Sequence, residues 1–79
     1  MKDIKIFDAE FKFMEIVWCE EPIRSGDLVK LADKELGWKK STTYTVIRRL
    51  VDRKILSNED SIVTSLVKKE EAQRAETEE

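Results

Sequence analysis

The 79-residue sequence contains no histidine, one cysteine, one proline and two glycines. Without histidine, and without a partner for Cys19, it lacks the residue pairs that hold a transition metal or activate a nucleophile. Two glycines do not make a glycine-rich phosphate-binding loop. A lone cysteine also excludes an internal disulfide. We therefore expect a protein that is not an enzyme and that has neither a metal site nor a cofactor.

Long hydrophobic segments are missing as well. No apolar run approaches the roughly 18 residues that a membrane-spanning helix needs. No basic-then-apolar signal segment opens the chain. These absences predict a cytoplasmic protein in a reducing environment, with no membrane partner. Cys19 is then expected to be a buried thiol, because the carboxylates of Glu15, Glu20 and Glu21 disfavour a reactive thiolate nearby.

Charge is abundant but unevenly placed. Charged residues make up 41% of the chain, and the formal net charge is −2. Residues 59–79 contain seven acidic and three basic residues, a balance of −4, so residues 1–58 carry +2. The length allows one domain. The acidic total therefore describes the C-terminal segment and not the body of the domain.

The most informative stretch is residues 38–54, WKKSTTYTVIRRLVDRK. Its apolar side recurs at helical spacing and predicts one buried helix face. That face consists of Thr43, Ile47, Leu50 and Val51. Ser41 or Thr42 is expected to cap the helix. The stretch has six basic residues and one acid, Asp52, a local balance of +5. A basic face that carries hydroxyl groups, in an acidic protein, is suited to a DNA major groove.

Two helices are predicted before this one. The first runs from Asp8, its expected N-cap, to about residue 19. Its apolar residues form two lines, so it should be largely buried. The lines are Phe7, Phe11, Met14 and Trp18, and Phe13 and Val17. Pro22 ends this helix, and residues 23–24 are expected to be a short strand. A second helix, capped by Ser25, then runs to about residue 36, with Gly37 closing it.

A β-hairpin is predicted after the third helix. Residues 55–57 and 62–67 read as strands around the turn-forming segment 58–61. From Lys68 onward the apolar residues are Ala72 and Ala75, so residues 68–79 are expected to fray or be disordered in isolation. The order of elements predicts a mainly α (α+β) winged helix-turn-helix, with three helices and a small antiparallel wing. We place the DNA-binding domain at residues 1–67 and an acidic tail at residues 68–79.

Individual roles follow from position on the third helix, whose N-terminal part reads bases in helix-turn-helix proteins. The residues predicted to contact bases or the groove are Ser41, Thr42, Tyr44, Thr45 and Arg48. Those predicted to contact phosphates are Lys39, Lys40, Arg49 and Arg53. One of Ser41 and Thr42 is expected to serve as cap alone. Arg49 is equally expected to pair with an acid of the first or second helix. Trp18 is expected in the core, and Trp38 is expected to pack against the third helix.

Several short motifs together carry a resemblance to a known family. They are Asp8-Ala9-Glu10, Trp18, Gly37-Trp38, Ser41-Thr42-Thr43-Tyr44-Thr45, Arg49-Leu50-Val51 and Leu66-Val67-Lys68-Lys69-Glu70-Glu71. With these residues the sequence resembles the penicillinase and methicillin-resistance repressors of the BlaI/MecI type, a family that also includes copper-responsive repressors of the CopY type. The resemblance implies a bacterial repressor whose third helix enters the major groove and whose wing touches the DNA backbone. It also implies a two-fold dimer on a pseudo-palindromic operator.

The sequence departs from the family pattern at three places. Glu59 and Asp60 stand in the wing turn, where they would repel phosphate. Lys54 replaces a usual glycine. The helical dimerisation region of the family would follow residue 79. The resemblance therefore implies a homodimer in any full-length form, with this chain weakly dimeric or monomeric.

Two functions are compatible with these observations. The first is a sequence-specific DNA-binding transcriptional repressor whose partner is a double-stranded operator. The alternative is a winged-helix protein–protein docking module without DNA binding. The +5 balance on the third helix favours the first, because a docking module has no need for it.

Overall fold

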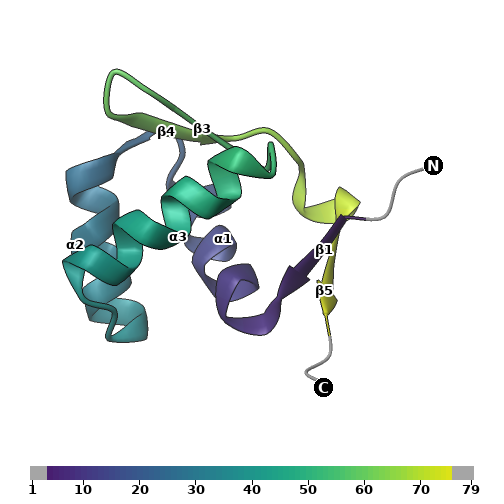
Figure 1. Cartoon of the computed structure of the whole chain (residues 1–79), viewed down its shortest axis with the longest axis horizontal. Coiled ribbons are helices and arrows are strands. Elements are labelled where there is room, and N and C mark those ends of the chain that lie inside the picture. The colour runs from purple at the N-terminus through teal and green to yellow at the C-terminus, as the bar shows by residue number, and fades with distance from the viewer. Residues whose placement is uncertain (1–3, 76–79) are drawn as a thin grey trace.

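Apolar residues at helical spacing produce three helices, and short strands join and cover them (Figure 1). The computed structural model describes residues 4–75. In chain order, the elements are β1 (Ile4–Phe7), α1 (Asp8–Glu20), β2 (Ile23–Arg24), α2 (Ser25–Leu36), α3 (Lys40–Asp52), β3 (Leu56–Glu59), β4 (Ile62–Ser65), the 3₁₀ helix η1 (Lys69–Glu71) and β5 (Ala72–Ala75). The predicted winged helix-turn-helix, with three helices and a small antiparallel sheet, is confirmed.

The wing is a three-stranded antiparallel sheet in the order β2-β4-β3. The short strand predicted at residues 23–24 is confirmed and pairs with β4. The hairpin turn is shorter than predicted, because Asn58 and Glu59 pair with β4 as part of β3. Asp60 and Ser61 alone form the turn, with φ of 54° and 64°. Positive φ at both positions is the conformation of the tight turns that connect hairpin strands.

The core lies between the helices and under the wing. Its largest fully buried side chains are Phe13, Ile6, Met14, Leu28, Leu50, Ile55, Leu56, Val17 and Val63. The predicted line through Phe7 and Trp18 is only partly inside, since Phe7 is 64% exposed and Trp18 is half-buried. Phe7 belongs to β1 and not to α1, so helical spacing does not apply to it. Trp18 still anchors α1, because its indole N–H donates to the Val67 carbonyl at 2.9 Å.

The helix boundaries agree closely with the sequence, but the predicted N-caps are wrong. Asp8 and Ser25 are the first residues of α1 and α2, and the N-cap positions belong to Phe7 and Arg24. Polar side chains are favoured in the first turn as well as at the N-cap, because the free N–H groups and the positive end of the helix dipole lie there. The sequence pattern does not distinguish the two positions. Gly37 is confirmed as the residue that ends α2, with φ of 71°. Only glycine adopts this conformation without steric cost.

The segment after the wing is structured through residue 75, so the expected fraying is wrong for residues 69–75. Here η1 leads into β5, which pairs in parallel with β1 and lies beside it at one side of the molecule (Figure 1). Ala72 is buried, and Lys69 Nζ lies 3.4 Å from the Glu15 carboxylate. Residues 72–75 form a strand although they have few apolar side chains, because the backbone of β1 supplies hydrogen-bond partners. Residues 76–79 lie outside the described range.

Cys19 is exposed, which corrects the prediction of a buried thiol. The buried positions of α1 include Phe13, Met14 and Val17. Two residues beyond Val17, the side chain points about 200° away around the helix axis. Within residues 4–75, no helix is both long and apolar enough to cross a membrane.

Candidate nucleic-acid interface

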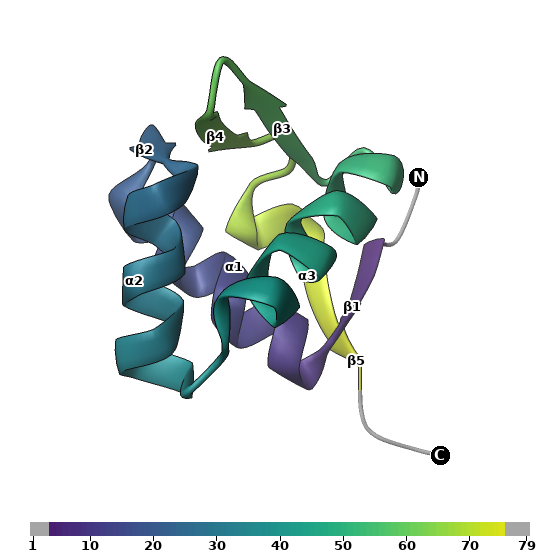
Figure 2. The ribbon, with the colours of Figure 1, turned by 60° about the vertical axis from the view of Figure 1, so that its left-hand side comes forward.

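The third helix lies on one face of the molecule. Figure 2 shows α3 at the front, with α1 behind it, α2 beside it and the β3–β4 hairpin above. The inner side of α3 is buried through Thr43, Val46, Ile47 and Leu50. Val51 is half-buried and packs against the core. The predicted inner face is therefore confirmed, with Val46 as an additional member that the sequence reading did not include.

The start of α3 leaves its hydroxyl groups free of a capping role. Lys39 occupies the N-cap position, and α3 begins at Lys40. Thr43 reaches back instead, because its Oγ1 donates to the Lys39 carbonyl at 3.0 Å and its N–H donates to the same oxygen at 2.9 Å. Ser41 and Thr42 are exposed within the first turn. The prediction that one of them caps the helix is therefore wrong.

The exposed side of α3 presents a line of polar residues opposite the buried face. Successive residues of a helix are about 100° apart around its axis, so spacings of four, three and four keep side chains on one line. That line is Ser41, Thr45, Arg48 and Asp52, all exposed. Tyr44 lies on one flank of the line and Thr42 and Arg49 on the other. The structure thus brings all five predicted base-contacting residues to the surface of one helix.

Some cations around α3 are exposed without an ion pair in the described residues, and one is held in an ion pair. Lys39 and Lys40 are exposed at its start. Arg49 is exposed and makes no ion pair with any residue in the described range. Arg53 differs, because its Nη1 lies 3.1 Å from Oε1 of Glu10 on α1. The helix-holding ion pair that the sequence left open for Arg49 is therefore made by Arg53.

Glu10 is the residue of this site that sequence reasoning missed. Its position in the first turn of α1 suggested only an interaction with the helix dipole, yet it is 8% exposed. Together with Phe7, Arg49, Asp52 and Arg53 it lines an open hollow of about 420 Å³ beside the C-terminal half of α3. The only sequence signal was an acid within a mostly buried helix, which usually requires a partner.

Two further contacts fix the position of α3. Trp38, just before it, stacks on Phe13 of α1 with ring centroids 5.3 Å apart and an interplanar angle of 19°. At its other end, the Ile55 N–H donates to the Leu50 carbonyl at 2.9 Å, and the Ile55 side chain is buried in the core. These contacts tie both ends of α3 to rigid parts of the fold, as a helix that must enter a groove as one body requires.

The wing tip is held toward α2. The Ser61 carbonyl accepts a hydrogen bond from the Ser25 N–H at 2.8 Å. At the far end of β4, the Glu21 carboxylate accepts from the Ser65 N–H at 2.6 Å and from its hydroxyl at 2.8 Å. The tip itself exposes Glu59 and Asp60. Its charge is therefore opposite to that of the α3 surface.

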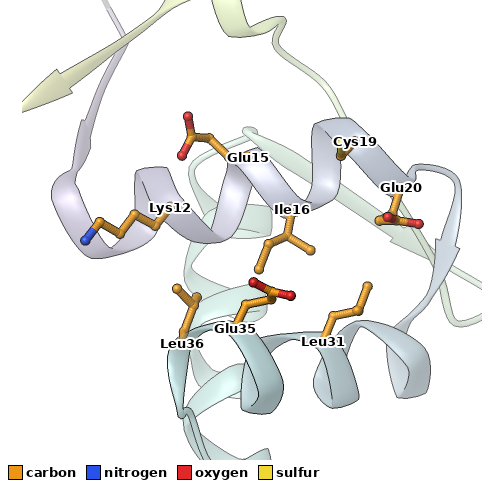
Figure 3. A pocket seen from close by; sticks show the side chains of 8 residues that line it. All are labelled: Lys12, Glu15, Ile16, Cys19, Glu20, Leu31, Glu35 and Leu36. Atoms are coloured by element: carbon orange, nitrogen blue, oxygen red, sulfur yellow. The ribbon is translucent and has the colours of Figure 1, made fainter.

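A second groove lies between α1 and α2 (Figure 3). It has a volume of about 450 Å³. Its lining mixes Ile16, Leu31 and Leu36 with the charged residues Lys12, Glu15, Glu20 and Glu35 and with Cys19. No group of side chains in the described residues could hold a metal ion. The concentrated positive charge of the molecule therefore distinguishes the α3 face as the candidate site.

The three helices and the antiparallel wing define a winged helix-turn-helix domain. Residues 6–79 match the family model described as penicillinase repressor. The chain therefore belongs to the penicillinase repressor family, which is a family of transcriptional repressors and not of enzymes. The resemblance seen in the sequence motifs is confirmed.

Three known proteins illustrate the similarity. The chain is 36% identical over 55 residues to an uncharacterized 16.5 kDa protein of Latilactobacillus sakei, a match that covers 70% of this chain and 38% of that protein. The solution structure of the DNA-binding domain of the repressor BlaI aligns with a TM-score of 0.80 at 23% identity, over 98% of this chain and 100% of that one. The monomeric form of Bacillus licheniformis BlaI, solved in complex with the blaP half-operator, aligns with a TM-score of 0.77 at 22% identity, over 96% and 98%. At these identities the two structures establish the fold.

Proposed function

We propose that this domain is a sequence-specific DNA-binding repressor that occupies a pseudo-palindromic operator through α3. The observation that carries the proposal is the outer line of α3, where Ser41, Thr45 and Arg48 are exposed on a helix with a buried opposite face. A single helix of this kind fits the major groove, which is about 12 Å wide. Occupation of the operator would block use of the promoter sterically.

The exposed residues divide into base readers and phosphate anchors. Arg48 can donate two hydrogen bonds to guanine O6 and N7, and the methyl group of Thr45 can meet a thymine methyl. Ser41, Thr42 and Tyr44 surround this position. Lys39, Lys40 and Arg49 suit phosphate contacts, which position a protein on DNA without reading sequence. Arg53 joins them only to the extent that its ion pair with Glu10 leaves N–H groups available.

A single copy would occupy one half-site. In a longer chain that dimerises, two-fold symmetry would place two α3 helices in the major groove about one helical turn apart, or a multiple of that distance. BlaI in its monomeric form has been solved with a half-operator, which supports half-site binding by one domain of this family. A chromosomal operator in a bacterium would also place the protein in the cytoplasm.

The first test is a titration with duplex DNA at about 50 mM and about 200 mM salt, followed by tryptophan fluorescence. Trp38 precedes α3 and should respond to DNA, whereas the half-buried Trp18 belongs to α1, and its indole N–H is bonded to the Val67 carbonyl. The variant Trp38→Phe is therefore the matched control, and it should bind without the fluorescence change. We expect binding that weakens steeply as salt rises.

A negative result has a clear meaning if a tethered dimer is measured beside the single domain. Two linked copies raise the local concentration of the second α3 and recover a weak half-site interaction. Absence of binding by both forms at low salt would overturn the proposed function and favour a docking module. Binding by the tethered form alone would leave the proposal intact and would show that one half-site is too weak by itself.

A further inference from the structure

Asp52 occupies an unexpected place on the candidate DNA surface. It is the only acidic residue among residues 38–54. It ends the exposed line that begins with Ser41 and continues through Thr45 and Arg48. If this line enters the groove, as the proposed function requires, a carboxylate enters or borders the groove with it.

Asp52 has no bonded partner in the described part of the fold. Its side chain is exposed, and in the described part of the chain it forms no hydrogen bond or ion pair, even with Arg48 or Arg49 on the same helix. It is also the last residue of α3, where the negative end of the helix dipole disfavours an acid. Asp52 borders the hollow beside α3 without a bonded partner in the described residues, and it opposes the helix dipole. An exposed acid in this position points to a role outside the folded chain.

A carboxylate meets few favourable partners on DNA. It only accepts hydrogen bonds when ionised, so phosphates and the acceptor edges of guanine and thymine repel it. The cytosine N4 amino group is the major-groove donor that Asp and Glu contact, whereas the N6 donor of adenine stands beside the acceptor N7. Asp52 would therefore weaken contact with most sequences and be satisfied where it faces a cytosine.

We propose that Asp52 is a specificity-determining residue, which selects a cytosine and penalises other bases at one operator position. This inference rests on the proposed function. Asp52 lies four residues after Arg48, about 6 Å farther along the helix axis. Bases of one strand are about 3.4 Å apart, so the cytosine lies one or two steps from the base that Arg48 reads.

The test is selection from a duplex library with a randomised centre, followed by affinity measurement on the selected sequences. The wild-type chain is compared with Asp52→Ala and Asp52→Asn, with circular dichroism to check that each variant folds. Glu35→Gln is the control for a general change of charge, because Glu35 lines the groove between α1 and α2 and is not on α3 (Figure 3). The Arg48→Ala variant identifies the base pair that Arg48 reads, because the preference at that base pair is lost. The position of the cytosine is counted from there.

The expected results differ for each variant. The wild type should prefer cytosine at that position by roughly fivefold or more, the lower end of discrimination by one base contact. Asp52→Ala should lose this preference and bind sites without the cytosine more tightly than the wild type does. Asp52→Asn should shift the preference to adenine, because an amide pairs with adenine N6 and N7. Glu35→Gln should select the same sequence as the wild type.

Two results would overturn the inference alone. One is selection of the same sequence with the same affinity by the wild type and Asp52→Ala. The other is a uniform gain in affinity for all sequences in Asp52→Ala, which would reduce Asp52 to a general electrostatic repulsion. Failure of the wild type to bind any duplex at low salt is distinguishable from both, because it removes the proposed function and this inference with it.

Discussion

Lys54, directly after α3, carries a backbone conformation that its side chain does not favour. Its φ is 63°, in the left-handed region where Cβ approaches the backbone too closely. The hydrogen bonds of the turn explain why it stays there. The Lys54 N–H donates to the Val51 carbonyl and the Ile55 N–H donates to the Leu50 carbonyl, both at 2.9 Å. This pair of bonds defines a Schellman motif, in which glycine is the usual residue.

We predict that Lys54→Gly stabilises the domain by about 0.5–1 kcal/mol, after the greater entropy of glycine in the unfolded chain is subtracted. The Lys54 side chain is exposed, so the core does not lose a contact. Urea denaturation of the two proteins measures the difference. Lys54→Ala is the control, because it removes the charge but keeps Cβ and should show no gain. Equal stability of Lys54→Gly and Lys54→Ala would mean that the positive φ is not a source of strain.

Single ion pairs show the limit of sequence reasoning at this scale. The sequence left two roles equally open for Arg49, an ion pair with an acid of the first or second helix and a contact with a phosphate. The structure gives this pairing to Arg53, with Glu10 as its partner. Both arginines lie on the same side of α3, one turn apart, so periodicity does not distinguish them. The distance to Glu10 decides, and that distance depends on how α1 and α3 cross.

The α3 helix as a whole was the most predictable element. Thr43, Ile47 and Leu50 are buried as predicted, because residues spaced by four and three lie on one face of a helix and that face packs on the core. Its cap was not predictable, because Lys39 starts the helix without any side-chain bond. The pairing of β1 with β5 was not predictable either. It joins the two ends of the described chain, and nothing local in residues 72–75 indicates a strand partner.

The division of α3 into readers and anchors yields a prediction at the scale of the element. Arg48→Ala should cost roughly 1–3 kcal/mol on the preferred site and relax the preference at one base pair. Lys40→Ala should weaken binding to all sequences similarly and lower the salt slope by about one. Titration of each variant against the preferred duplex and an unrelated duplex, at two salt concentrations, separates the two effects.

The control for this pair is a cation elsewhere on the molecule. Lys12 lines the groove between α1 and α2, so Lys12→Ala should keep both the affinity and the salt slope. If Arg48→Ala and Lys40→Ala lose the same factor on both duplexes, the division into readers and anchors is wrong. The DNA contact would then be electrostatic along the whole helix.

Across the whole molecule, charge is separated and not only unbalanced. The net charge is −2, whereas residues 38–54 carry +5. The exposed acids Glu59 and Asp60 sit at the wing tip, which is bonded to the start of α2 through Ser61 and Ser25. Such a separation orients a protein as it approaches a polyanion. The α3 face would therefore meet DNA first, with the acidic wing tip contributing less than the helix.

At the scale of the whole molecule, β1 and β5 join the two ends of the described chain and close one side of the core. Ile6 is 0% exposed and belongs to the same buried cluster as Ala72. The sequence predicts a domain that ends at residue 67, whereas this pairing predicts that residues 72–75 contribute to its stability. Full burial of an isoleucine side chain contributes about 1.5–3 kcal/mol.

Deletion of residues 68–79 should therefore lower the free energy of unfolding by at least about 1 kcal/mol, since Ile6 loses part of its cover. Urea denaturation of the full and shortened chains measures this change. Glu70→Gln is the control within the same segment, because Glu70 is exposed and should leave stability unchanged. An unchanged free energy of unfolding in the shortened chain would place the end of the domain at residue 67. It would also make the β1–β5 pair an addition to a core that is already complete.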